Sequence, residues 1–276
     1  MTIDKKSLIN WVGGKRLLRK TIAPLIPKDI LSYVEPFGGA GWVFFYNDKW
    51  AELEIYNDLD GRLVNLFRIV KYHPEALKEE LKYLLGSREI FMQFLNMVGI
   101  TDIQRAAQFL FLITRSFAGM GENYGTVKKV GGGANKSQAN MLLKIDAIHK
   151  RLDKVLIENR DFEKLITQYD HKDAFFYCDP PYTYGAGYDV TSTKDFDHER
   201  LRDLLKNIKG RFLLSYDDSP KIRELYKGYE MIEIERLNGL NNRQGGERKN
   251  KIFKELLIAN YSIKELFHAG SDRNKG

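Results

Sequence analysis

Short apolar runs that alternate with helical patterns constrain the fold of this chain more than any other feature. Each run has the length and composition of a buried strand and ends in loop residues. The runs occupy residues 32–35, 53–56, 155–158, 174–178, 211–215, 230–234 and 255–259. Apolar residues at helical spacing lie between most of them, as in residues 59–70 and 197–208. The alternation predicts an α/β fold with a doubly wound, mainly parallel, seven-stranded sheet. Only a loop separates the last two runs, which predicts a hairpin and one antiparallel edge.

A long helical segment interrupts this alternation. From residue 71 to residue 153 the strand pattern disappears, and Thr101 and Gln104 have the spacing of a capping box. Apolar helical repeats cover residues 77–85, 90–98 and 101–117. Residues 118–137 are polar, basic and glycine-rich, which predicts a mobile loop or hairpin. We therefore expect residues 1–70 and 154–276 to form one domain, with residues 71–153 inserted as a helical subdomain.

Composition excludes several classes of protein. The chain has 276 residues, of which 43% are hydrophobic and 29% charged, as in an ordinary globular protein with a large core. Cys178 is the single cysteine, so no intramolecular disulfide is expected. The five histidines are scattered without the spacing of a zinc site, and we predict no metal. The start has no signal-peptide pattern and no apolar stretch is long enough to cross a bilayer, so we expect no membrane association and a cytoplasmic protein.

The distribution of charge points to an anionic partner. The formal net charge is +7, with a pI near 9.2. Residues 115–154 contain eight basic and three acidic residues, and residues 236–254 contain six basic residues and one acidic residue. Both stretches are basic and contain glycines, and they resemble a protein surface that faces phosphates. The alternative interpretation is a solvated charged face.

The sequence Asp179-Pro180-Pro181-Tyr182 follows the apolar run 174–178. A residue before proline favours an extended backbone, and neither proline has an N–H group. The tip of this strand therefore presents a carboxylate, a carbonyl and an aromatic face, but few donors. That set suits a flat ligand with an exocyclic amino group, such as a nucleobase. The alternative is a strand that ends in a Pro-Pro turn.

Two glycine turns and an acid predict a site for a nucleotide-like cofactor. Glu-Pro-Phe-Gly-Gly-Ala-Gly at residues 35–41 follows the first strand and precedes an apolar helix start at residues 42–45, and its glycines let the backbone approach a ligand. The third glycine of the dinucleotide fingerprint is missing, which argues against an NAD enzyme. Asp58 ends the second strand and is placed to bind ribose hydroxyls. Trp11 offers an aromatic face to a cation, and Lys15 a counter-charge to a carboxylate. S-adenosylmethionine carries an adenosine with ribose hydroxyls, a sulfonium cation and a carboxylate. It therefore fits these residues better than NAD or ATP.

Five motifs in order resemble the Dam-like group of DNA adenine-N6 methyltransferases. They are Trp11-Val-Gly-Gly-Lys15, Glu35-Pro-Phe-Gly-Gly-Ala-Gly41, Asn57-Asp58, Asn159-Arg-Asp161-Phe162 and Asp179-Pro-Pro-Tyr182. The resemblance runs from Trp11 to Asp218. It implies a Rossmann-like methyltransferase fold in which a target-recognition domain separates the cofactor motifs from the catalytic motif. Carried over by position, the residues implied to hold S-adenosylmethionine are Trp11, Lys15, Phe37, Gly38, Gly39, Gly41, Asp58, Asp161, Phe162 and Asp179. Asp179, Pro180, Pro181 and Tyr182 are implied to hold the target adenine.

A DNA methyltransferase requires residues that face double-stranded DNA. We expect Lys128, Lys129 and Lys136 to meet phosphates. Arg115, Asn123 and Tyr124 are candidates for reading bases or filling the gap left by a flipped adenine, although a helix-end arginine and a hairpin-packing tyrosine are the alternatives. Family members that methylate GATC typically carry Phe-Asn-Gly-Leu and a following Arg-x-Asn in this hairpin. Residues 116–125 read Ser-Phe-Ala-Gly-Met-Gly-Glu-Asn-Tyr-Gly, which does not support GATC. The sequence leaves open whether a cognate restriction endonuclease accompanies the enzyme.

The implied mechanism is methyl transfer from S-adenosylmethionine to an adenine extruded from the duplex. Asp179 and the Pro180 carbonyl would each accept one N–H of the amino group, while Tyr182 would stack on the base. Within the same chemistry, cytosine N4, RNA adenine or a protein amide remain alternative targets, although Asp179 in first position favours adenine. Among proteins that do not transfer methyl groups, the alternatives are an NAD-type dinucleotide oxidoreductase and a DNA-binding protein with a degenerate catalytic site.

Overall fold

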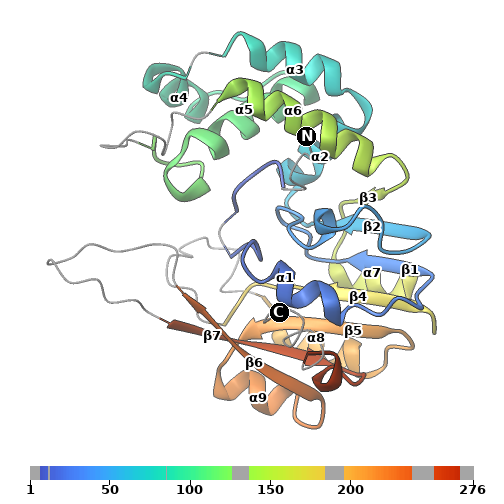
Figure 1. Ribbon diagram of the computed structural model, residues 1–276. Helices are drawn as coiled ribbons and strands as arrows, with labels where there is room; N and C mark the ends of the chain where they lie inside the picture. The colour runs from blue at the N-terminus through green and yellow to red at the C-terminus, as the bar shows by residue number, and fades with distance from the viewer. Residues whose placement is uncertain are drawn as a thin grey trace, which may run out of the picture. The chain divides into compact units, whose positions relative to one another are not determined.

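The structure is a computed structural model that describes residues 7–11, 13–84, 86–125, 137–183, 196–237 and 252–267. In this part of the chain seven strands form one sheet in the order β3-β2-β1-β4-β5-β7-β6 (Figure 1). The strands are β1 (Ser32–Glu35), β2 (Leu53–Asn57), β3 (Leu156–Glu158), β4 (Ala174–Cys178), β5 (Arg211–Asp217), β6 (Glu230–Leu237) and β7 (Ile252–Ala259). Each strand overlaps one of the predicted apolar runs. The predicted α/β fold with a seven-stranded sheet is confirmed.

The pairing of the strands is mainly parallel, with one antiparallel edge. β1 pairs with β4, β4 with β5 and β2 with β3 in parallel. β7 pairs antiparallel with both β5 and β6, so the predicted hairpin is confirmed. The strand order reverses between β1 and β4, and ligands of doubly wound folds bind outside the carboxyl ends of the strands at such a point. Glu35 ends β1, and Asp179 directly follows β4.

Hydrophobic burial explains why the central strands form. All residues of β4 are buried, as are all those of β1, and the interior of β5 is buried from Phe212 to Tyr216. A parallel strand covered on both faces reads as a continuous apolar run rather than an alternating one. The run Ala-Phe-Phe-Tyr-Cys of β4 has this pattern. It carries the chain to Asp179 at the carboxyl edge of the sheet.

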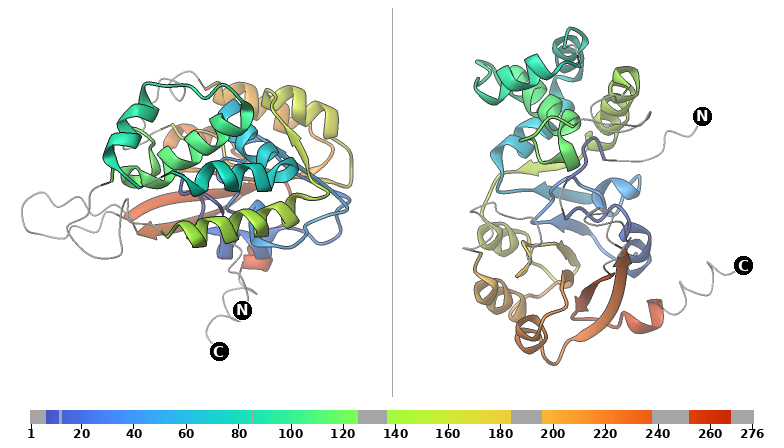
Figure 2. Two further views of the ribbon diagram at one scale, coloured as in Figure 1. Left: turned by 90° about the horizontal axis from the view of Figure 1, so that it is seen from above. Right: turned by 90° about the vertical axis from the view of Figure 1, so that its left-hand side faces the viewer.

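The α-helices of the described residues are short to medium in length. They are α1 (Arg19–Ile22), α2 (Gly61–Tyr72), α3 (Pro74–Lys82), α4 (Arg88–Leu95), α5 (Asp102–Arg115), α6 (Gln138–Leu152), α7 (Phe162–Tyr169), α8 (His198–Lys206) and α9 (Pro220–Leu225). Helices α2 and α3 both pack on α5 and α6, and α4 packs on α5, so that α2 to α6 form one cluster (Figure 2). None of the helices in the described ranges is long and apolar enough to cross a membrane.

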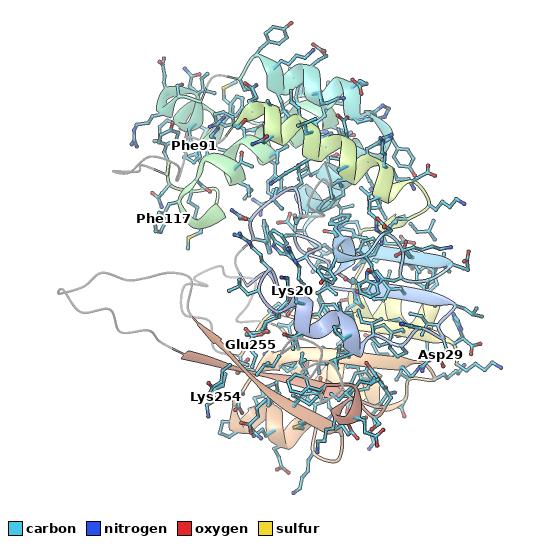
Figure 3. All side chains as sticks on the ribbon, in the orientation of Figure 1. Lys20, Asp29, Phe91, Phe117, Lys254 and Glu255 are labelled. Atoms are coloured by element: carbon cyan, nitrogen blue, oxygen red, sulfur yellow. The ribbon has the colours of Figure 1, made fainter. Side chains whose placement is uncertain are left out.

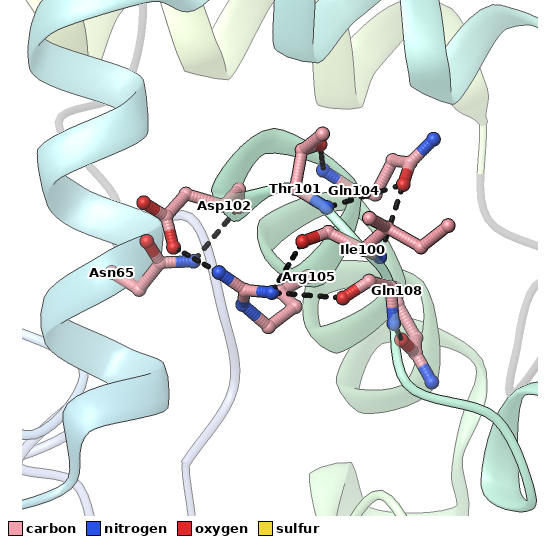
Figure 4. A network of polar contacts seen from close by, with 8 residues as sticks. Asn65, Ile100, Thr101, Asp102, Gln104, Arg105 and Gln108 are labelled. Atoms are coloured by element: carbon pink, nitrogen blue, oxygen red, sulfur yellow. Dashed lines mark hydrogen bonds and ion pairs between the residues drawn. The ribbon is translucent and has the colours of Figure 1, made fainter.

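The start of α5 shows how sequence fixes a helix boundary in this cluster (Figure 4). The Thr101 hydroxyl accepts the N–H of Gln104 at 3.1 Å, and the Gln104 side chain accepts the N–H of Thr101 at 3.3 Å, so the predicted capping box is present. Asn65 of α2 donates to the carbonyl of Asp102 at 2.9 Å. Arg105 donates to the carbonyl of Ile100 at 2.7 Å. These bonds satisfy polar groups that a helix start leaves open and fasten α5 to α2.

The chain divides into two compact units. The first unit comprises Met1–Arg16, Gly38–Lys49 and Glu54–Arg160, and the second comprises Leu17–Phe37, Trp50–Leu53 and Asp161–Gly276. The first unit therefore contains the helical cluster with β3 and most of β2, and the second contains β1 and β4 to β7.

The segment after the glycine turn differs from prediction. We expected an α-helix to begin at residues 42–45, but the structure has a single 3₁₀ turn at Phe44–Tyr46, after which Asn47 is extended. Residues 42 to 45 are all buried, and the Phe45 ring packs against the Gly41 backbone, where an added Cβ would lie 2.4 Å from that ring. Because apolar residues occupy every position of this short segment, its sequence has no amphipathic period that would distinguish a helix from another buried conformation.

Candidate functional site

The glycine turn of the first unit rests directly on an aromatic ring. Gly38 donates its N–H to the carbonyl of Asn57 at 2.7 Å, and the Tyr56 hydroxyl donates to the carbonyl of Gly39 at 2.6 Å. A Cβ added to Gly38 would lie 2.3 Å from the Tyr56 ring, which excludes any side chain there. Gly39 and Gly41 have φ values of +49° and +66°, in the region that favours glycine. Glycines at these positions thus let the turn pack closely on Tyr56 and keep its conformation.

Asp58 fixes this turn from the end of β2. One carboxylate oxygen accepts the N–H of Gly39 at 2.8 Å, and the other accepts the N–H of Asp60 at 2.8 Å. Burial raises the pKa of Asp58 to about 6, although the two N–H groups favour the ionised form. Sequence reasoning assigned this residue to ribose binding alone. The structure adds a second role, because the same carboxylate shapes the glycine turn.

Two asparagines tie together the loops after β2 and β3. Asn57 donates to the carbonyl of Arg160 at 3.0 Å and accepts the N–H of Arg160 at 2.8 Å. Asn159 donates to the carbonyl of Asp58 at 2.8 Å. The sequence motifs contained both asparagines, but no role was assigned to either. Their position at neighbouring strand ends, which the parallel pairing of β2 and β3 brings together, explains the reciprocal bonds.

Trp11 lies beside the glycine turn. A Cβ built on Gly39 would be 3.4 Å from the Trp11 ring, and that ring is 6.2 Å from the ring of Phe109 on α5. Lys15 is 3% exposed and donates to the carbonyl of Gly13 at 3.2 Å. In the first unit the structure therefore brings Trp11, the glycines and Asp58 together, with Lys15 buried on the preceding turn.

An aromatic cluster in the second unit contains the predicted cofactor residues Phe37 and Phe162, and Asp161 is linked to it through Arg200. The Phe37 ring is 5.5 Å from the Phe162 ring and 5.6 Å from the Phe196 ring. Asp161 caps α7 by accepting the N–H of Glu163 at 3.1 Å and forms an ion pair with Arg200. The Arg200 guanidinium lies 4.6 Å from the centre of the Phe162 ring. Phe196 escaped sequence reasoning because no motif surrounds it.

A chain of hydroxyl groups leads to Asp179. The Ser215 hydroxyl donates to the Asp179 carboxylate at 2.9 Å and lies 3.2 Å from the Tyr177 hydroxyl. Because Ser215 has a single hydroxyl proton, Tyr177 is the donor in the second bond. Burial, and secondly the charge of Asp179, raise the pKa of Tyr177 well above its usual value, so this donor stays protonated. Asp179 therefore keeps a fixed orientation at the end of β4.

The two residues after the prolines are also held by side chains. The Tyr182 hydroxyl donates to Glu255 at 2.9 Å, and its ring is 5.9 Å from the ring of Tyr216. Thr183 donates its N–H to Asp217 at 2.8 Å. Burial raises the pKa of Tyr182 well above the ordinary range, with the charge of Asp179 adding to the effect, which keeps its hydroxyl a donor. Neither Asp217 nor Glu255 was singled out from the sequence, because each lies within a strand and outside any motif.

The predicted DNA-facing residues divide into packed and exposed groups. Arg115 is only 7% exposed, and the Tyr124 hydroxyl donates to the carbonyl of Gly86 at 2.9 Å. Asn123 is exposed, and so is Phe117 on the adjoining 3₁₀ turn, with 59% of its surface accessible (Figure 3). Sequence reasoning missed Phe117. Lys128, Lys129 and Lys136 lie outside the described residues. Among the residues that are described, no three His, Cys, Asp or Glu side chains are grouped to hold a metal ion.

The chain matches the family of D12 class N6 adenine-specific DNA methyltransferases over residues 11–240. This match covers most of the 276 residues. The chain belongs to this family. Membership confirms the resemblance found in the sequence motifs, and it makes the protein an adenine-specific DNA methyltransferase whose substrate is DNA.

Relatives of similar length support the assignment to this family. Type II methyltransferase M1.LlaDCHI of Lactococcus lactis subsp. cremoris is 29% identical, with 94% of this chain and 96% of the relative covered. Type II methyltransferase M.CviBI of Paramecium bursaria Chlorella virus NC1A is 25% identical, with 93% and 100% covered. DNA adenine methylase of Haemophilus influenzae is 27% identical, with 92% and 93% covered. This adenine methyltransferase is thus similar to these relatives over at least 92% of its length.

Proposed function

We propose that this adenine-specific DNA methyltransferase takes its methyl group from S-adenosylmethionine and holds a flipped adenine on Asp179, Pro180 and Tyr182. The observation that carries the proposal is the fixed acceptor tip after β4. Asp179 is oriented by Ser215, and Pro180 and Pro181 have no N–H to compete for the acceptors. An exocyclic amino group, which has two N–H donors, is the matching partner.

The donor set of the first unit suits S-adenosylmethionine. Asp58 can accept hydrogen bonds from ribose hydroxyls, since each carboxylate oxygen has a further lone pair beyond the one that the turn occupies. Trp11 offers an aromatic face and Lys15 a positive charge. The backbone of Gly38 packs on the Tyr56 ring, and Gly39 faces the Trp11 ring. The proposed set also contains Phe37, Gly41, Asp161, Phe162 and Asp179. When bound, this cofactor supplies an electrophilic methyl group.

The residues after β4 prepare the adenine amino group for attack. Its lone pair is delocalised into the ring, so the group is a poor nucleophile. Asp179 and the Pro180 carbonyl accept its two N–H bonds and draw the nitrogen toward a tetrahedral geometry, which frees the lone pair. Tyr182 stacks on the base and compensates part of the cost of removing it from the duplex. Preorganised acceptors of this kind account for a large share of rate acceleration in enzymes.

The inserted helical segment, residues 71–153, is the proposed target-recognition subdomain, and residues 1–70 and 154–276 form the proposed catalytic domain. The exposed side chains of Phe117 and Asn123 support contacts with bases, and Lys128, Lys129 and Lys136 are proposed to meet phosphates. Arg115 and Tyr124 remain candidates for contacts with DNA, although both make packing contacts in the free protein. The names of the type II relatives support a restriction–modification role, in which methylation protects DNA from a cognate endonuclease.

Calorimetric titration with S-adenosylmethionine tests the cofactor site directly. We expect Asp58→Ala and Trp11→Ala each to weaken binding, because one removes an acceptor and the other an aromatic wall. Loss of one charge-assisted hydrogen bond costs about 1.5–3 kcal/mol, or roughly a tenfold to hundredfold rise in Kd. Asp29→Ala, which removes an exposed acid from the second unit, is the matched control. Unchanged affinity in both site variants would overturn the assignment.

A further inference from the structure

The loop after β4 has no backbone N–H donor at two consecutive positions, because both are prolines, Pro180 and Pro181. Its flanking residues are instead held by side chains of the neighbouring strands. Ser215 of β5 donates to Asp179 at 2.9 Å. Asp217 of β5 accepts both the N–H and the hydroxyl of Thr183. Glu255 of β7 accepts the hydroxyl of Tyr182 at 2.9 Å.

Asp217 and Glu255 are direct cross-strand partners. They face each other in the antiparallel register of β5 and β7, where side chains of paired residues lie on the same face of the sheet. Two like charges in such a pair destabilise a sheet. Glu255 is also only 1% exposed, and burial of a carboxylate adds a further cost. The pair therefore does not stabilise the sheet. Both carboxylates instead bind residues of the loop after β4, Glu255 the hydroxyl of Tyr182 and Asp217 the N–H of Thr183.

We propose that Asp217 and Glu255 act as a carboxylate clamp that positions Tyr182 and Thr183 for the methyl-transfer reaction. Asp217 fixes the backbone after the prolines through Thr183, and Glu255 fixes the tilt of the Tyr182 ring through its hydroxyl. The inference rests on the proposed function, in which the Tyr182 ring stacks on the flipped adenine. Glu255 lies beyond residues 11–240 that match the family, on β7, which pairs with β5 and β6 (Figure 3).

The clamp acts on the reaction through ring orientation. A tyrosine ring can rotate about two side-chain bonds, and the Tyr216 ring packs on one side of the Tyr182 ring, with the ring centres 5.9 Å apart. A hydrogen bond at the far end of the ring removes that freedom. Catalysis by positioning is sensitive to small displacements of the reacting groups. Removal of the clamp should therefore lower kcat more than it raises KM for DNA.

A double-mutant cycle tests the clamp, with unmethylated plasmid DNA and tritiated S-adenosylmethionine as substrates. Tyr182→Phe keeps the ring and deletes only the hydroxyl, and Glu255→Leu deletes its acceptor. We expect each change to lower kcat roughly 10- to 100-fold, and the double variant to be no slower than the slower single variant. Glu255→Gln, which keeps an acceptor oxygen, should restore most of the lost rate. Glu235→Gln, at an exposed position of the neighbouring strand β6, should leave kcat unchanged.

A second measurement reports on the base rather than on the rate. Once the methylated positions are mapped, a duplex with 2-aminopurine in place of the target adenine will fluoresce when that base leaves the stack. We expect Tyr182→Phe and Glu255→Leu to change this signal in the same way, and Glu255→Gln to restore it. Because Tyr182→Phe removes one hydroxyl only, the test stands even if Glu255→Leu does not fold.

The outcomes separate the clamp from the proposed function. If Asp179→Ala abolishes transfer but the effects of Tyr182→Phe and Glu255→Leu multiply in the double variant, the clamp is wrong and the catalytic site stands. Full activity of Tyr182→Phe would likewise overturn the clamp. Near-normal turnover of Asp179→Ala would instead overturn the proposed function on which the clamp rests.

Discussion

At the scale of single residues, Asp58 links the shape of the cofactor site to its chemistry. Its carboxylate holds the N–H groups of Gly39 and Asp60, and the proposed cofactor competes for the remaining lone pairs. Burial raises its pKa to about 6, and the nearby charge of Asp60 acts in the same direction. The side chain is therefore ionised at neutral pH but close enough to its pKa to lose its charge in mild acid.

This pKa predicts that cofactor affinity depends on pH. The ionised carboxylate is the better acceptor for ribose hydroxyls, so S-adenosylmethionine should bind best above pH 7. Below pH 6 the protonated fraction grows, and Kd should rise about tenfold for each further pH unit. Asp58→Asn cannot titrate and should bind weakly with a flat profile over the same range. Calorimetric titrations at several pH values measure both proteins. An equally steep profile in Asp58→Asn would show that another group is responsible.

At the scale of elements, a buried ion pair fastens α6 to β2. Arg151 forms two hydrogen bonds with Glu54, at 2.8 and 2.6 Å, and their side chains are only 9% and 7% exposed. Arg151 also donates to the carbonyl of Asn47 at 2.8 Å and lies 4.9 Å from the centre of the Phe44 ring. One arginine thus connects the last helix of the cluster to β2 and to the 3₁₀ turn that follows the glycine turn.

We expect Arg151→Ala to lower the free energy of unfolding by about 3–5 kcal/mol, because it leaves the Glu54 charge buried and unpaired. Urea denaturation followed by circular dichroism measures this change. The double variant Arg151→Met, Glu54→Leu should be clearly more stable than Arg151→Ala, since it buries no charge. Lys150→Ala, at the exposed neighbouring position of α6, is the control. A loss below about 1 kcal/mol for Arg151→Ala would show that the pair behaves as an exposed one.

The sequence predicts the elements of this fold better than their ends. Strands such as Ala174–Cys178 were predictable because a buried parallel strand is a continuous apolar run bounded by loop residues. The capping box of α5 was predictable because its two side chains are three residues apart. The expected helix at residues 42–45 failed because Trp42 to Phe45 are buried on all sides, and periodicity does not distinguish such a segment from a helix start.

Candidate site residues could be predicted where they follow strands in motifs, as Asp58 and Asp179 do. Residues that contact the site from a distant part of the chain could not be predicted. Glu255 reaches Tyr182 across 73 positions of sequence, and only the antiparallel return of β7 brings the two together. The packing of Arg115 likewise depends on Gly86, where an added Cβ would lie 3.2 Å from the guanidinium. A single sequence contains no local signal for such long-range contacts.

At the scale of the whole molecule, the net charge of +7 predicts DNA binding that depends strongly on salt. Replacement of Lys128, Lys129 and Lys136 by alanine should weaken binding to all sequences alike. It should also reduce the slope of log K against log salt by about one unit for each lysine. Fluorescence anisotropy with specific and random duplexes at several salt concentrations measures both effects. A triple variant of the exposed Lys206, Lys209 and Lys227 is the control. A slope equal to that of the unaltered protein would place the phosphate contacts elsewhere.

Asp179 and its neighbours are proposed to bind the adenine whose N6 amino group accepts the methyl group. The most direct test of this proposal is transfer of tritiated methyl from S-adenosylmethionine to unmethylated DNA, followed by digestion and separation of the nucleosides. We predict that all the label appears in N6-methyldeoxyadenosine. We also predict that Asp179→Ala lowers the rate by about 10²–10³ while the Kd for S-adenosylmethionine stays within about twofold. Label in any other nucleoside, or near-normal turnover by Asp179→Ala, would contradict this account.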